Sequence, residues 1–161
     1  MKQRKLRSKL QFHENEIEAV FQKLISYWDE LIEFYNREVK FEYEKESDRL
    51  IYIDMADISR FIANKKLSGE VEYFEIFFEN VETIFTNADE TVRNLIVVGL
   101  FEDIQNIGGK EIDYYRSFDQ WLKPNSLKAW RTLIDFWEGK DWKKTNESQA
   151  ILNNKNKAND S

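Results

Sequence analysis

The sequence predicts an all-α fold, in the form of a single-domain bundle of about six helices. The 161 residues include only five glycines and one proline, too few for an all-β sandwich with turn residues at every hairpin. Apolar residues recur at intervals of three and four along most of the chain, as they do in amphipathic helices. Hydrophobic residues make up 42% of the chain, enough for the core of one domain of this length.

The two ends of the chain differ in composition from the part between them. Residues 1–11 are basic and have no apolar face, whereas residues 143–161 are polar, rich in Asn and Lys, and without periodicity. We therefore expect a flexible arm over 1–11, one helical domain over 12–142 and a disordered tail over 143–161.

The first expected helix runs from Phe12 to Tyr35, where the apolar residues leave one face for solvent. The next segment, 39–54, alternates apolar and charged residues around the turn-like stretch EKESD. It is compatible with a short β-hairpin or with an irregular loop, because a lone hairpin is weak unless it packs on something. After Asp54 the helical pattern returns, and it closes at Gly69.

A third helix is expected to begin at Glu70, with its phenylalanines facing the core. Four carboxylates share one adjoining face, and we call them the acidic ridge: Glu72, Glu75, Glu79 and Glu82. Like charges at these spacings cost a few tenths of a kcal/mol per pair. The acidic ridge is therefore either a solvated face or a surface that is kept acidic because a basic partner meets it.

A fourth helix is expected from Thr91 to Ile107, with Asp89 and Glu90 at the end where the helix dipole favours anions. Its apolar residues surround the axis, which predicts a central helix with neighbours on several sides. It has only about half of the ~20 apolar residues that a membrane span needs. Gly99 in its middle indicates the close approach of another helix.

Two shorter helices are expected in the last part of the domain. The first covers roughly 114–122, with Tyr114, Phe118 and Trp121 facing inward. The second follows Pro124, a residue that suits a first helical turn, and stops at Gly139.

Polar residues at the end of the fourth helix predict a structural network. Glu102 and Asp103 diverge by about 100° around the helix axis, which is a poor arrangement for two-carboxylate catalysis. Glu102 lies one turn before Asn106, and Asp103 is expected to reach a basic residue elsewhere in the chain, such as Arg60 or Arg116. The predicted network comprises Asp57, Arg60, Glu102, Asp103 and Asn106.

The residue types exclude several kinds of chemistry. The chain has no cysteine and a single histidine, His13, so thiolate nucleophiles, histidine metal sites and serine triads are not expected. No GxSxG, GxxxxGK[ST] or GxGxxG motif occurs. We therefore expect no enzyme activity, no metal and no cofactor. The absence of a secretory segment and of cysteines predicts a cytoplasmic location.

The charge distribution predicts the kind of partner. The net charge of −6 divides into +5 on residues 1–9, +2 on 143–161 and −13 on 10–142. An acidic body repels nucleic acid and attracts basic proteins, although acidic charge can also act through solubility alone. No direct nucleic-acid or membrane partner is expected.

Three stretches together resemble, in order and spacing, a family of small helical bacterial proteins of unassigned function: MADISRFIA, VRNLIVVGLFEDIQNI and FDQWLKPNSLKAWRTLIDFWEG. The resemblance covers roughly residues 53–139. Some members of that family look like immunity proteins encoded beside polymorphic or contact-dependent growth-inhibition toxins. The resemblance carries over no catalytic residue.

The resemblance and the charge lead to one functional hypothesis, an immunity protein that occludes the basic active site of a toxin domain, an RNase or a DNase. Tyr115 and Trp142 are candidate aromatic anchors. The alternative is a helical interaction module that acts as a regulator or adaptor. The predicted partner-binding residues are Glu72, Glu75, Glu79, Glu82, Asp89, Glu90, Asp113 and Tyr115.

Overall fold

The computed structural model describes residues 11–40, 43–45, 48–108 and 112–139. Within these residues the chain forms six helical segments and no strand, which confirms the predicted all-α class. Apart from the helices, an isolated parallel bridge joins Phe12 to Ala88. Almost all of the predicted arm over 1–11 and the whole predicted tail over 143–161 lie outside the described residues.

Three of the helical segments change type along their length, and the first of them passes from the 3-10 helix η1 into α2. α3 continues without a break as the π-helix η2, and α6, the π-helix η5 and α7 form one continuous helix. In chain order the elements are η1 (Glu14–Glu16), α2 (Ile17–Ile25), α3 (Asp29–Phe34), η2 (Tyr35–Val39), α4 (Ile51–Ser68), α5 (Phe74–Thr86), α6 (Glu90–Asn94), η5 (Leu95–Phe101), α7 (Glu102–Gly108) and α8 (Pro124–Glu138).

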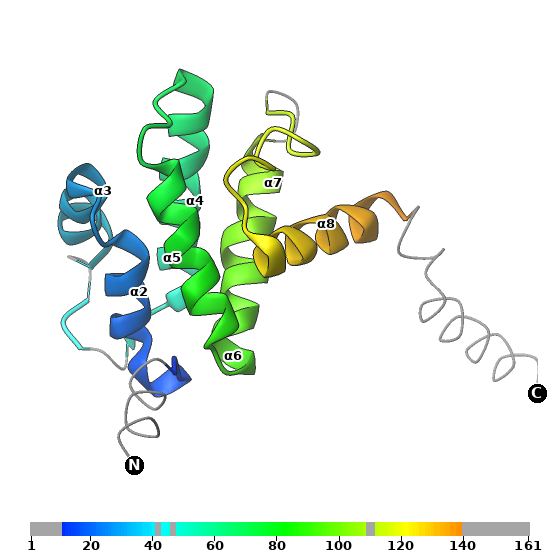
Figure 1. The fold of residues 1–161 in the computed structure, drawn as a ribbon. Coiled ribbons are helices and arrows are strands. Elements are labelled where there is room, and N and C mark those ends of the chain that lie inside the picture. Colours follow the sequence, from blue (N-terminus) through cyan, green and yellow to red (C-terminus); the bar gives the residue numbers. More distant parts are fainter. Residues whose placement is uncertain (1–10, 41–42, 46–47, 109–111, 140–161) are drawn as a thin grey trace, which may run out of the picture.

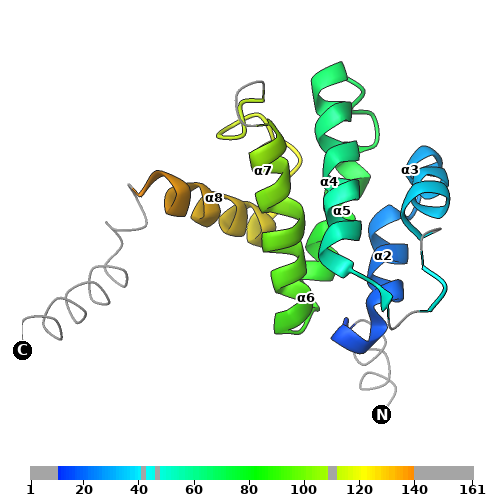
Figure 2. The ribbon, with the colours of Figure 1, turned by 180° about the vertical axis from the view of Figure 1, so that it is seen from behind.

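The helices pack around one hydrophobic core. α5 lies between α2 and α8, while α4 runs along η5 and α7 (Figures 1 and 2). The largest buried side chains are aromatic, among them Tyr35, Phe74 and Trp130. α8 crosses the other helices at a steep angle, and its C-terminal half projects away from them. One end of α8 is therefore held by the core and the other is exposed.

The predicted single helix over 12–35 is wrong, because the chain breaks between α2 and α3. Tyr27 adopts a left-handed backbone with φ = +67°, which turns the chain between the two helices. Asn80 of α5, 4% exposed, donates hydrogen bonds of 3.2 Å to the carbonyl oxygen and to the hydroxyl of Ser26. The polar groups of Ser26 at this break are thus hydrogen-bonded by a side chain that is distant in sequence. The local sequence pattern does not reveal this contact.

Of the two alternatives for 39–54, the described residues bear out the irregular loop. The stretch predicted as the second strand, Leu50–Ile53, instead enters α4, which begins at Ile51, and the residues described between η2 and α4 form no strand. The predicted third helix begins at Phe74, later than expected. α4 ends at Gly69 as predicted, where φ is +76°.

The short helix predicted over 114–122 is also wrong, since these residues form consecutive turns. The Asp113 side chain accepts a hydrogen bond from the backbone N–H of Tyr115 at 3.1 Å, and the Asp113 carbonyl accepts one from the Ser117 hydroxyl. Such local bonds give the backbone an alternative to helical pairing. α8, by contrast, starts at Pro124 and stops at Gly139 as predicted.

The central position of the fourth helix and the role of Gly99 are confirmed. A Cβ atom at Gly99 would lie 3.1 Å from the Met55 Cγ atom of α4 and 3.2 Å from the Leu95 Cδ1 atom. The buried Ser59 hydroxyl lies 2.8 Å from the Met55 carbonyl oxygen and 3.1 Å from that of Gly99. The glycine therefore lets the backbone of η5 approach the Met55 and Ser59 side chains of α4 closely.

Gly99→Val should destabilise the protein by about 1–3 kcal/mol, because the added methyl groups would push α4 away from η5. The midpoint of urea unfolding, with circular dichroism as the signal, measures the effect. Val98→Ala, at the adjacent position that is 46% exposed, is the control and should change stability by less than about 0.5 kcal/mol. Equal midpoints for Gly99→Val and the wild type would contradict the close approach.

Candidate protein-binding surface

The acidic ridge lies on α5 and the turn before it, in the part of the chain with the densest negative charge. Between Lys66 and Arg93 the sequence has seven carboxylates and no lysine or arginine. Glu72, Glu75 and Glu79 are exposed, whereas Glu82 is half-buried. The four members of the ridge therefore differ in what they can contact.

Glu82 holds the first turn of α8. Its carboxylate accepts hydrogen bonds of 2.9 Å from the backbone N–H groups of Asn125 and Ser126 and from the Asn125 amide. Burial raises the pKa of Glu82, but the hydrogen bonds from Ser126 and Asn125 outweigh burial and lower it overall. An anion at a helix N-terminus is also favoured by the helix dipole. Glu82 is thus a structural contact between α5 and α8.

Two other predicted partner-binding carboxylates also have internal contacts. Glu75 forms an ion pair with Lys123, just before α8. Asp89 caps α6 by accepting a 3.0 Å hydrogen bond from the Val92 N–H, and it accepts a second from the Glu14 N–H. The Val92 bond is the main reason that the pKa of Asp89 is lowered.

Three of the predicted carboxylates remain available on the surface. Among the described residues, the side chains of Glu72, Glu79 and Glu90 form no hydrogen bond or ion pair, and all three are exposed. Asp113 is exposed as well, although one of its oxygens is occupied by the turn described above.

Tyr115 lies beside the C-terminal end of α8. Its ring stacks on Tyr114 with 4.9 Å between centroids, its hydroxyl donates a hydrogen bond to Glu138, and it is 43% exposed. Trp142, the other predicted anchor, lies outside the described residues.

The predicted structural network is only partly assembled. Arg60 donates to Asp57 at 3.1 Å, and the pKa of Asp103 is raised by burial and by Glu102, with Arg60 opposing. Within the described residues, Glu102 and Asn106 form no hydrogen bond with this group, and Asn106 is exposed.

Gln105 takes the buried place that was predicted for Asn106. Its amide donates to the Trp130 carbonyl oxygen at 3.4 Å, and its own oxygen has no partner among the described residues. The cause is η5, because an i→i+5 helix places one more residue in each turn than an α-helix does. The residues after Phe101 therefore face other directions than a regular α-helix predicts.

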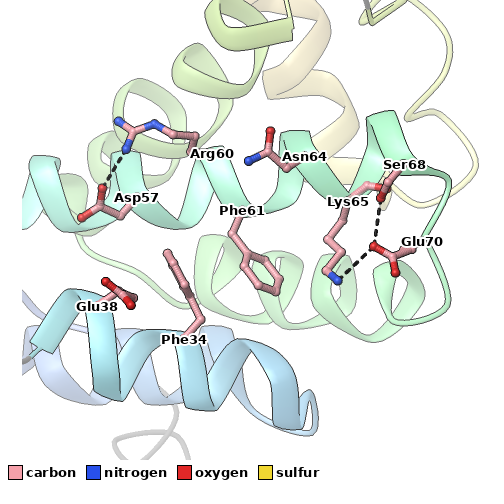
Figure 3. Close-up of a pocket in the computed structure, with 9 residues that line it drawn as sticks. All are labelled: Phe34, Glu38, Asp57, Arg60, Phe61, Asn64, Lys65, Ser68 and Glu70. Carbon is pink, nitrogen blue, oxygen red and sulfur yellow. Dashed lines mark hydrogen bonds and ion pairs between the residues drawn. The ribbon is translucent and has the colours of Figure 1, made fainter.

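A polar groove of about 580 Å³ lies between α3–η2 and α4 (Figure 3). Its floor is the ring pair Phe34 and Phe61, whose centroids are 5.0 Å apart. Arg60 pairs with Asp57, as described above, and Lys65 pairs with Glu30 at 2.6 Å and with Glu70 at 3.1 Å. Each of these two cations thus has a carboxylate partner, so the described residues that line the groove offer no free cation to an anionic ligand.

A buried network that the sequence did not predict surrounds Arg49. Its side chain is 5% exposed and donates hydrogen bonds to Glu18 (2.5 Å), Tyr35 (2.7 Å) and Asp54 (2.8 Å). The guanidinium carbon also lies 4.4 Å from the centroid of the Phe21 ring. These groups join α2, η2 and the start of α4.

The pKa values in this network follow from burial and from the mutual hydrogen bonds. Burial raises the pKa of Glu18, but hydrogen bonds from Tyr35, Gln22, Arg49 and Lys40 lower it to about 2. Burial and the bond to Glu18 raise the pKa of Tyr35. Burial also raises the pKa of Asp54, against the bond from Arg49. The donors and acceptors are directed at one another, as in a structural cluster.

In the parts of the chain that the structure describes, no group of three His, Cys, Asp or Glu side chains is placed to hold a metal ion. None of the described helices combines the length and the hydrophobicity that a membrane span needs.

The fold and the surface together define an acidic all-helical protein with a carboxylate-bearing face on α5. The chain belongs to the family of the domain of unknown function DUF7674, whose model matches residues 14–138. No curated protein and no solved structure matches the chain. The predicted relationship to a family of unassigned function is thereby confirmed, and the match begins nearer the N-terminus than the resemblance over 53–139.

The Glu18 carboxylate of the Arg49 network should make a contribution to stability that is lost in acid. The folded pKa of Glu18 is about 2, below its ordinary value near 4.3, so its stabilisation is present above pH ~4.3 and is lost toward pH 2. We expect Glu18→Gln to remove part of this acid dependence, roughly 1 kcal/mol after allowance for solvent screening of the part-exposed carboxylate.

Urea unfolding at pH 7, 5 and 3 measures this dependence, with Glu16→Gln, an exposed position two residues earlier, as the control. If Glu18→Gln and Glu16→Gln change the acid dependence equally, the depressed pKa of Glu18 is wrong.

The carboxylates of the acidic ridge should differ in how much they contribute to the free energy of unfolding. Glu82→Ala removes three hydrogen bonds from the start of α8 and should cost about 1–2 kcal/mol, in the range of a lost helix cap. Glu79→Ala, one turn earlier on the same face, should stay within about 0.5 kcal/mol of the wild type. Chemical unfolding of the two variants measures the difference. Equal losses of unfolding free energy in both variants would show that Glu82 contributes no more to stability than Glu79.

Proposed function

We propose that this protein is an immunity protein that binds and neutralises the basic nuclease domain of a bacterial toxin. The observation that carries the proposal is the segment between Lys66 and Arg93, with its seven carboxylates and no cation. Glu72, Glu79 and Glu90 on this segment are exposed and free of internal partners among the described residues. A surface of this kind attracts a positively charged protein.

The chemistry of a nuclease fits this surface. A cleft that holds phosphate groups is lined by cations, and carboxylates on an inhibitor can take the place of those phosphates. An immunity protein also has to bind before the toxin reaches its substrate, and long-range electrostatic attraction raises association rates by 10- to 1,000-fold. The acidic face of α5 would supply that attraction.

The internal contacts of the ridge support the same function. Glu75 and Glu82 tie α5 to the region where α8 begins, through Lys123, Asn125 and Ser126. Glu79, the exposed carboxylate between them, is therefore carried on a helix that is fixed at two points. A surface fixed in advance loses less conformational entropy on binding.

Co-expression provides the test: any large secreted protein encoded beside this gene supplies its C-terminal domain as the candidate toxin. Wild-type protein should restore growth, and the two purified proteins should co-elute on gel filtration at low salt. Glu72→Lys with Glu79→Lys should lower the association rate constant at low salt by about 10-fold or more and flatten its salt dependence.

The control is Glu33→Lys on α3, a side chain that is 73% exposed, at a position away from α5. It should leave the rate constant nearly unchanged. A complex that forms without restoring growth would point to the adaptor alternative, and the absence of both growth rescue and complex would refute the proposed function. An unaltered rate constant in the double variant would show that the acidic ridge is only solvated.

A further inference from the structure

An apolar groove of about 500 Å³ runs along α8. One wall is a stripe on α8 that includes Ala129, Leu133 and Phe136, and the other wall is formed by Phe85 of α5 and Val97 of η5. The stripe spans the residues from Asn125 to Phe136, which is roughly 17 Å along the helix. The groove has the size and the apolar lining of a binding site.

The exposure of Phe136 is unusual for an aromatic ring at the wall of such a groove. The ring is 62% exposed, and its neighbour Trp137 is 44% exposed. Both residues lie on the part of α8 that projects from the other helices (Figures 1 and 2). Large exposed aromatic groups beside an apolar hollow are typical of the centre of a protein interface.

The groove is continuous with the acidic ridge. Asn125 lies at the start of the groove and, at the same time, donates its backbone N–H to Glu82. Phe85 follows Glu82 by three residues on α5, so it lies on the same side of that helix. Glu82 and, one turn earlier, the exposed Glu79 thus lie on the side of α5 that borders the apolar groove.

We propose that this groove holds apolar side chains of the toxin domain, while cations around those side chains meet the carboxylates of α5. The proposal rests on the proposed function and assigns the two parts of the surface different tasks. The carboxylates attract the partner, and the groove retains it, because buried apolar anchors determine the dissociation rate more than the association rate.

The charge of this surface argues against a second copy of the same chain in the groove. Two copies meeting here would place Glu79 and its neighbours close to the same carboxylates of the other copy. Residues 10–142 carry −13, so such a dimer would bring like charges together. A basic partner with an apolar anchor avoids this conflict, and Lys128 is the one cation among the described residues that line the groove.

Surface plasmon resonance with the same candidate toxin domain as in the co-expression test examines the proposal on the full chain. Phe136→Ala should raise the dissociation constant by about 30-fold or more, the size of a hot-spot effect, through the dissociation rate. Thr132→Trp should do the same by filling the groove from an exposed position on α8. Tyr52→Ala, at an exposed aromatic of α4 that does not line the groove, is the control and should leave binding unchanged.

The outcomes separate this proposal from the proposed function. Faster dissociation of both groove variants, with association rate and helix content unchanged, supports the groove as the anchor site. Normal dissociation of both variants from a toxin domain that the wild type binds overturns the groove proposal and leaves the proposed function intact. No complex with the wild type overturns both. A wild-type dimer that Phe136→Ala dissociates would show that a second copy is the occupant, and would also overturn the groove proposal.

Discussion

The position of the N-terminal third of this protein depends on one buried guanidinium group. Arg49 binds Glu18 of α2, Tyr35 of η2 and Asp54 of α4 at once. Removing one partner from a buried ion cluster is strongly destabilising, because it leaves a charge without compensation. The three elements therefore hold their relative positions together, and α4 in turn packs along η5 and α7. In this way one side chain from an irregular stretch connects the early helices to the centre of the fold.

Helical periodicity in the sequence was sufficient to predict the all-α class, the central helix and the ends of α4 and α8. The close contact at Gly99 was predicted correctly, because glycine destabilises the middle of a helix and is seldom found there unless another element packs closely against it. The break at Tyr27 could not be predicted, because Asn80, which satisfies it, lies far away in sequence. The turns over 114–121 escaped prediction since their apolar residues, here packed against the core, also fit a helical stripe.

The acidic ridge was found from spacing alone, because residues three and four apart share a helix face. The contacts of each carboxylate depend on where α8 packs. Glu79 and Glu82 therefore share a helix face in the sequence pattern but differ in their contacts in the structure. The burial of Arg49 was not predicted, because this residue lies in a run of charged residues, a pattern that indicates solvent-exposed surface. Gln105 was missed because η5 alters the direction of every residue after it.

The difference between structural and exposed carboxylates has a consequence for how sequences of this family can vary. Glu75 and Glu82 anchor α8, whereas Glu72, Glu79 and Glu90 support no internal contact among the described residues. Substitutions at the second group leave the described internal contacts intact, whereas those at the first group remove contacts that stabilise the start of α8. Members of the family could therefore differ in their exposed charges, one substitution at a time, while the packing of α5 against α8 stays the same.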